Sequence, residues 1–137
     1  MTSPEDRALI ERSLEIAAER GGDLTAAVYA RLFQERPELE AMFVMDTDGA
    51  VRGEMLSRVF DAILDFIGDR NYAQNWISAE ATTHEGYLVP RGDFVRFFEI
   101  VAETVRDTCS GWSEDTSAAW QRLNDDVGAH ISKHHPS

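Results

Sequence analysis

Apolar residues recur at intervals of three and four along most of this 137-residue chain, and no other feature limits its fold as strongly. The longest such run comprises Met55, Leu56, Val59, Phe60, Ile63, Leu64 and Ile67. This spacing places side chains on one face of an α-helix, whereas a half-buried strand would alternate apolar and polar residues. No segment shows that alternation between turn signals, so the sequence predicts an all-α fold.

Start and stop signals divide the chain into about six or seven helices. Ser3 and Pro4 begin the first, Arg36 before Pro37 ends the second, and Asp93 is the expected cap of a later one. Their apolar stripes are Leu9, Ile10, Leu14, Ala17 and Ala18; Leu24, Val28, Leu32 and Phe33; Phe94, Phe97, Phe98, Val101 and Val105; and Trp120, Leu123, Val127 and Ile131. We expect one domain over residues 1–137, with 1–4 and 133–137 as loose tails.

Composition narrows the classes of function. The net charge of −12, from 25 acidic and 13 basic residues, repels nucleic-acid phosphates and anionic lipid head groups, so we expect neither nucleic acid nor membrane as a partner. The single cysteine, Cys109, excludes an intramolecular disulfide and a site built from several thiolates. Residues 1–15 lack the apolar stretch of a signal peptide. These features together favour a cytoplasmic protein.

Few residues have the chemistry of a reactive site. Three of the four histidines, His130, His134 and His135, lie near the C-terminus, which we interpret as a polar tail. The fourth, His84, lies within residues 71–89, where the helical pattern is weak. A lone histidine is more often a structural residue than a ligand, and a divalent-metal site with borrowed carboxylates is a further alternative. No P-loop, GxGxxG or nucleophile-elbow motif is present.

The order of landmarks around His84 resembles the globin family. Tyr29, Phe33, Pro37 and Phe43 precede a long apolar helix, His84 follows it, and an aromatic-rich helix comes next. The stretch 28–43 (VYARLFQERPELEAMF) is similar to the B, C and CD segments of bacterial single-domain globins and of flavohaemoglobin haem domains. The resemblance covers nearly the whole chain and implies a globin-like fold around a haem pocket.

The resemblance also implies roles for individual residues. His84 would be the proximal ligand of the haem iron, and Tyr29 would donate a hydrogen bond to bound oxygen on the distal side. The haem would be b-type (heme b), because no CxxCH attachment motif is present. Haem needs an apolar slot and one imidazole nitrogen, with the other nitrogen held by an acceptor. The expected slot residues are Phe43, Leu56, Phe60, Val89, Phe94 and Phe98.

Two positions depart from the family pattern. No histidine or glutamine stands at the distal position, where either Arg52 or Gly53 would occupy the gate. Glu80 stands one turn before His84, where globins usually place an apolar residue. Tyr29 is therefore the chief polar group expected over the iron, with Arg52 as a second distal candidate.

The functions implied are reversible binding of oxygen, nitric oxide or carbon monoxide, and nitric oxide dioxygenase activity that would draw electrons from a separate reductase. One alternative is a gas- or redox-sensing module whose dimer surface responds to the ligand. Another is a haem-free helical domain of the same architecture. The expected oligomeric state is a monomer or a homodimer.

Overall fold

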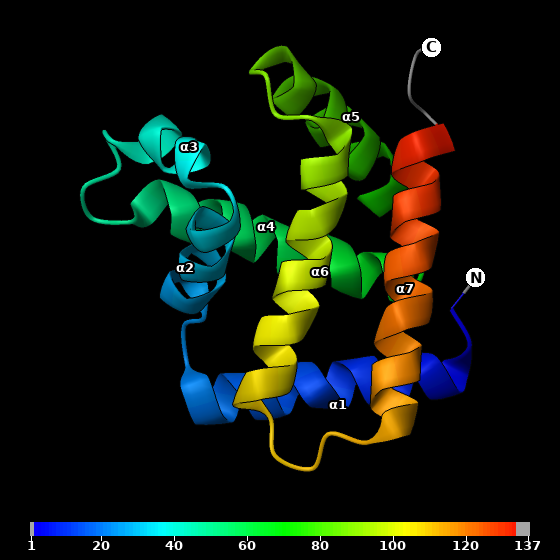
Figure 1. The fold of residues 1–137 in the computed structure, drawn as a ribbon. Coiled ribbons are helices and arrows are strands. Elements are labelled where there is room, and N and C mark those ends of the chain that lie inside the picture. Colours follow the sequence, from blue (N-terminus) through cyan, green and yellow to red (C-terminus); the bar gives the residue numbers. More distant parts are fainter. Residues whose placement is uncertain (1, 134–137) are drawn as a thin grey trace.

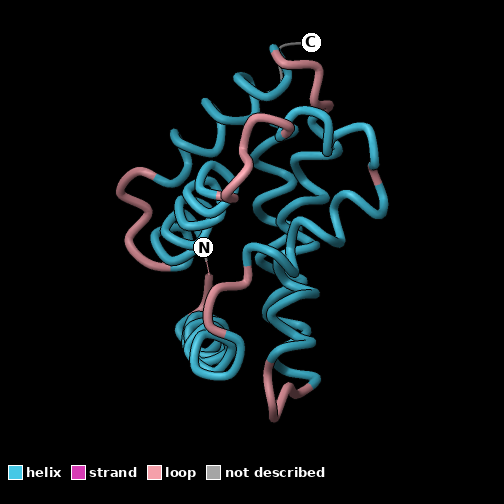
Figure 2. The backbone as a smooth tube through the Cα atoms, turned by 90° about the vertical axis from the view of Figure 1, so that its left-hand side faces the viewer, coloured by secondary structure: helices cyan, strands magenta, loops and turns pink. Residues whose placement is uncertain are grey.

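The computed structural model describes residues 2–133, and helices are the only regular secondary structure within them, which confirms the all-α prediction (Figure 1). Its elements are α1 (Pro4–Gly21), α2 (Thr25–Glu35), α3 (Pro37–Glu40), the 3-10 turn η1 (Ala41–Phe43), α4 (Ala50–Ile67), α5 (Ala73–Gly86), α6 (Arg91–Thr108) and α7 (Glu114–Lys133). Short loops join the helices, and the described part of the chain contains no strand (Figure 2).

The helix boundaries follow local signals in the sequence. The Asp6 amide donates to Ser3 Oγ at 3.1 Å at the start of α1, and the Thr116 amide donates to Ser113 Oγ at 3.0 Å at the start of α7. Such side-chain caps satisfy amides that have no partner inside the helix. α2 ends at Glu35 because Arg36, which precedes Pro37, leaves helical geometry.

Some boundaries differ from the prediction. Ser3 caps α1 and Pro4 is its first residue, so these two residues are not part of a loose tail. Asp93 is not a cap, since α6 begins two residues earlier at Arg91 and the Asp93 carboxylate instead pairs with Arg36. His130 lies inside α7, where its ring bonds Ser78 Oγ and the Gln74 carbonyl oxygen. Of the tail expected at 133–137, Lys133 is instead the last residue of α7, and residues 134–137, including His134 and His135, lie outside the described residues.

α6 is the central helix, in contact with α1, α2, α5 and α7. α4 crosses behind the middle of α6, and α1 lies across the end of the molecule where α6 finishes (Figure 1). The largest fully buried side chains include Trp120, Phe66 and Phe98. The Trp120 indole also donates to Ser13 Oγ at 2.9 Å, joining α7 to α1 through a buried hydrogen bond.

Gly21 allows α1 to approach α6 closely. A Cβ atom at this position would lie 2.6 Å from Thr108 Cγ2, closer than real Cβ contacts come, and 3.1 Å from Leu24 Cδ2, closer than most of them. Within the glycine pair at residues 21–22, Gly21 thus has a steric role, while Gly22, whose φ is +61°, ends the helix. None of the described helices is both long enough and apolar enough to span a membrane.

Candidate functional site

A cavity of about 490 Å³ lies between α2, the α3–η1 segment, α4, α5 and the start of α6. Its walls are mostly apolar and aromatic, with a few polar groups among them, and its volume lies in the range typical of ligand pockets. The residues on it that the sequence predicted are Tyr29, Phe43, His84, Val89 and Phe94. The fold therefore brings together five of the nine predicted site residues, from five different segments.

His84 lies in the last turn of α5 with one ring nitrogen already engaged. Its Nδ1 is 2.7 Å from the carbonyl oxygen of Glu80, a contact in which Nδ1 carries the proton and donates it. Nε2 then keeps its lone pair, and it has no hydrogen-bond partner among the described residues. The ring also lies 5.1 Å from that of Phe94, centroid to centroid, which limits its rotation. A ring held in this way presents Nε2 as a metal ligand.

Two charged groups fix the helix that carries His84. The Asp65 carboxylate accepts the amides of Asn71, Tyr72 and Ala73 at 3.0, 2.9 and 2.8 Å, and so caps the start of α5. Burial by itself would raise the pKa of Asp65. The three hydrogen bonds lower the pKa by more, so the net shift is downward. At the other end of α5, buried Arg91 donates to Thr82 Oγ1 and to the Ile131 carbonyl oxygen.

Tyr29 contributes the most unusual polar atom of the cavity. Its side chain is 2% exposed, and its hydroxyl is buried with no hydrogen-bond partner among the described residues. The ring is held by Phe33, Phe43 and Phe97, with centroid distances of 5.7, 5.5 and 5.5 Å. Burial raises the pKa of Tyr29, so the hydroxyl stays protonated and remains a donor. A buried donor without an acceptor suggests that a ligand supplies the acceptor.

Arg52 does not line the cavity. Its Nε donates to Asp46 Oδ2 at 3.0 Å and its Nη2 to the Asp46 carbonyl oxygen at 2.9 Å. Burial by itself would raise the pKa of Asp46. The hydrogen bonds from the Val51 and Arg52 amides and from the Arg52 side chain lower the pKa by more, so the net shift is downward. Gly53 lines a different cavity, so neither predicted gate residue reaches this one. Arg52 instead joins the loop before α4 to the first turn of that helix.

The face of α4 toward the cavity differs from the expected face. Leu56 and Phe60 line a second cavity of about 320 Å³, formed with α1 and the start of α2. The His84 cavity is lined instead by the residues that directly precede Arg52, Leu56 and Phe60, which are Val51, Met55 and Val59. One residue corresponds to about 100° around a helix, so a shift of one position moves the expected stripe to a neighbouring face. Both faces are apolar, and periodicity alone did not distinguish them.

Phe98 is the other predicted slot residue that lies outside the cavity. It is 1% exposed and contacts Phe94 edge-on at 5.7 Å between centroids, so it supports the cavity wall from behind. Two residues that were not predicted, Trp76 on the His84 helix and Tyr87 just beyond it, also line the cavity. The spacing of Trp76, Glu80, His84 and Tyr87 at intervals of four, four and three was the available signal.

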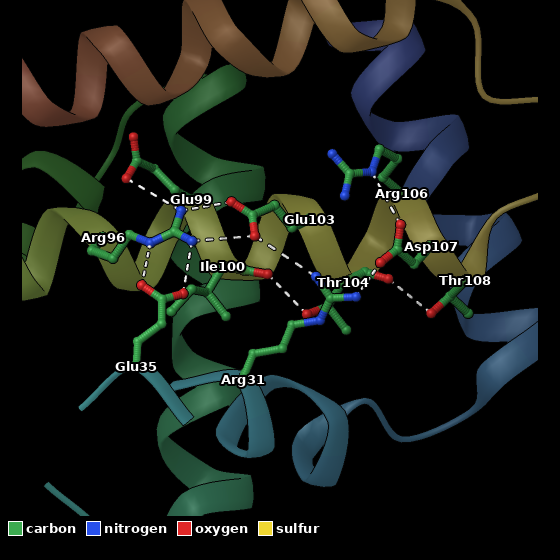
Figure 3. A network of polar contacts seen from close by, with 10 residues as sticks. All are labelled: Arg31, Glu35, Arg96, Glu99, Ile100, Glu103, Thr104, Arg106, Asp107 and Thr108. Carbon is green, nitrogen blue, oxygen red and sulfur yellow. Dashed lines mark hydrogen bonds and ion pairs between the residues drawn. The ribbon is translucent and has the colours of Figure 1, made fainter. Parts of the chain in front are cut away.

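A surface ion-pair network holds α2, and with it Tyr29, against α6 (Figure 3). Arg96 bonds Glu35 at 2.8 Å and Glu103 at 2.6 Å, and Arg31 pairs with Glu103 and Asp107. The hydrogen bonds that Arg96 donates to the carboxylates of Glu35 and Glu103 raise the pKa of Arg96. These side chains are about one-third to one-half exposed, so each pair contributes little by itself and the network acts as a set of contacts.

Comparison with known proteins agrees with this arrangement. The family model described as Globin matches residues 26–131, a span that includes Tyr29, Phe43 and His84. No curated protein and no solved structure is significantly similar to the chain. The match covers most of the chain and all of the cavity.

Proposed function

Because the chain belongs to the globin family, we propose that it binds b-type haem in the His84 cavity and uses it to bind a diatomic gas, with oxygen as the main ligand. The observation that carries the proposal is the pairing of a cavity-facing imidazole, held through Nδ1, with a buried tyrosine hydroxyl that has no partner in the described chain. The first group suits a metal ligand, and the second suits a donor to a bound ligand.

The residues present fit haem. An apolar cavity excludes water from a porphyrin, and Phe43, Val89 and Phe94 supply aromatic and aliphatic walls for it. His84 would hold the iron through Nε2, while the Glu80 carbonyl oxygen keeps the proton on Nδ1 and fixes the ring. The Glu80 carboxylate also lies beside this histidine, with Oε2 3.7 Å from Nδ1.

Haem would supply an iron atom at which oxygen, nitric oxide or carbon monoxide binds. The Tyr29 hydroxyl would donate a hydrogen bond to the partial negative charge that bound oxygen carries. The aromatic rings around Tyr29 restrict its movement, so little conformational entropy is lost when the bond forms. These residues support reversible oxygen binding as the primary activity.

The proposal extends to conversion of nitric oxide and oxygen to nitrate. That activity requires an electron for each turnover, and a separate reductase would supply it. Stopped-flow mixing of the oxygenated protein with nitric oxide tests the extension. Fast oxidation to the ferric protein supports it, and the absence of such oxidation leaves oxygen binding as the function.

Haem titration of the purified protein tests the central proposal, with absorbance spectra of the oxidised, reduced and carbon monoxide-bound forms. We expect the wild type to take up one haem and His84→Ala to lose the normal ferrous spectrum. His130→Ala, which removes a histidine outside the cavity, is the matched control and should bind haem as the wild type does. A wild type that takes up no haem would instead support the haem-free alternative.

A further inference from the structure

Exposed apolar side chains gather around the opening of the cavity. Eight large apolar side chains are exposed in the described part of the chain. Three of them line the cavity, and three more lie within two residues of a lining residue along the chain. These six, which we call the mouth surface, are Met42, Val44, Met45, Val51, Tyr87 and Leu88. The segments that carry them lie on the side of the molecule opposite α1 (Figure 1). Apolar groups concentrated in this way usually mark a binding site.

The mouth surface has an inner and an outer part. Met42, Val51 and Tyr87 line the cavity, so a group bound there would cover them. Val44, Met45 and Leu88 do not line it, and they are 74%, 89% and 90% exposed. Haem in the cavity would therefore leave the outer three in contact with water. A partner that covers them would have to bind outside the cavity.

Leu88 adopts a backbone conformation that leucine rarely takes. Its φ is +67°, in the left-handed region that favours glycine, and its amide donates to the Glu85 carbonyl oxygen at 3.0 Å. Glycine would complete this helix end at lower free-energy cost, and the exposed leucine side chain adds no burial to the fold. A residue that is unfavourable in both respects fits a role in contact with another molecule.

The surroundings of the mouth surface are acidic. Residues 36–58 and 80–93, which frame the cavity, contain eight carboxylates and four arginines. Each of these arginines, Arg36, Arg52, Arg58 and Arg91, already pairs with a carboxylate of the same two segments. Glu40 and Asp48 form no ion pair among the described residues. The excess charge repels a second copy of this chain, which carries the same net charge of −12.

We propose that the mouth surface is the docking site of a basic electron-donor protein. This inference rests on the proposed function, because it places the donor at the opening through which bound haem would be reached. The apolar centre within an acidic border matches the small, short-lived interfaces of redox partners, in which charge steers the encounter. The donor gives up one electron, which reduces ferric to ferrous iron, and no bond forms or breaks.

Cytochrome c, a basic redox protein, is the probe for this surface. The first measurement is its binding to the purified protein, with and without haem, by sedimentation. The second is the rate of electron exchange, in which the ferrous haem-loaded protein reduces ferric cytochrome c without oxygen; the electron here moves in the reverse of the proposed direction but crosses the same surface. Two double variants disrupt the site: Met45→Ser with Leu88→Gly, and Glu40→Gln with Asp48→Asn. Their controls alter exposed residues elsewhere, Leu64→Ser with Tyr72→Ser and Glu19→Gln with Asp69→Asn.

We expect each mouth variant to weaken binding and slow exchange by roughly five- to tenfold, and the controls to change either by less than about twofold. Raising the salt from about 20 mM to about 500 mM should reduce both quantities in the wild type. Thermal unfolding checks that the variants fold. Equal effects in mouth and control variants, or self-association in place of cytochrome c binding, would overturn the proposal. If the wild type takes up no haem, the proposed function fails, and binding to the haem-free protein still tests the surface.

Discussion

The Tyr29 hydroxyl should have opposite effects in two states of the protein: it should destabilise the haem-free fold and stabilise the oxygen-bound form. A buried hydroxyl without a partner destabilises the fold by about 1–3 kcal/mol, because it loses its hydrogen bonds to water. Tyr29→Phe removes that hydroxyl and keeps the ring contacts with Phe33, Phe43 and Phe97. We therefore expect haem-free Tyr29→Phe to be more stable than the haem-free wild type, with a free energy of unfolding higher by at least about 1 kcal/mol.

Oxygen binding should reverse the preference. The hydroxyl then has an acceptor, and a neutral hydrogen bond of about 0.5–1.5 kcal/mol corresponds to roughly two- to twelvefold in a dissociation rate. We expect Tyr29→Phe to release oxygen faster by a factor in that range. Stopped-flow displacement of oxygen by carbon monoxide measures this rate, and urea unfolding of the haem-free protein measures stability.

Tyr72→Phe is the control, since this tyrosine is 46% exposed and does not line the cavity. It should change neither the stability nor the oxygen release rate beyond about 0.5 kcal/mol. A haem-free Tyr29→Phe protein less stable than the wild type would show that the hydroxyl has a partner in the fold. An unchanged oxygen release rate would refute its role as a donor to the ligand.

Three further predictions concern the frame around the site. Asp65→Ala should cost about 1–2 kcal/mol in urea unfolding at neutral pH through loss of the α5 cap. Because the pKa of Asp65 is lowered in the folded state, the stabilisation by Asp65 should disappear as pH falls from about 4 through that pKa. The variant and the wild type should then be equally stable. Gly21→Ala should cost about 1–3 kcal/mol, and adding Thr108→Ser, which deletes the clashing methyl group, should restore most of the loss; no recovery would refute the steric explanation. Ser13→Ala should cost about 1–3 kcal/mol in thermal or urea unfolding by leaving a buried indole N–H unpaired, whereas Ser117→Ala, which removes an exposed indole partner, should cost less than about 0.5 kcal/mol; equal losses would contradict the role of burial.

Much of the fold was predictable because local signals and tertiary contacts agree. The helix that ends before Pro37 and the long helix at residues 50–67 both appear where proline and the apolar spacing placed them. The segment around His84 looked weak because Thr82, Thr83 and Gly86 have low helix propensity. Its helix forms because Asp65, from a different helix, caps it, and such a distant contact has no signature in the local pattern.

The site was predictable to the level of segments and less so to the level of faces. Tyr29, Phe43 and His84 reach one cavity as the resemblance implied. Leu56 and Phe60 do not, because α4 has two apolar faces and only its packing against the other helices decides which one lies over the cavity. The sequence alone indicates that Arg52 lies on a helix surface. Its ion pair with Asp46 could not be predicted, because it forms only when the loop before α4 folds back on the helix.

The two sides of the cavity rest on interactions with different sensitivity to ionic strength. The tyrosine side depends on α2, which is joined to α6 by partly exposed ion pairs that dissolved salt screens. The histidine side depends on a helix fixed by Asp65 and by Arg91, whose side chain is only 7% exposed and is screened much less. Under the proposed function, a higher salt concentration would therefore loosen the tyrosine side before the histidine side, so that release of the gas could change while the amount of bound haem stays constant.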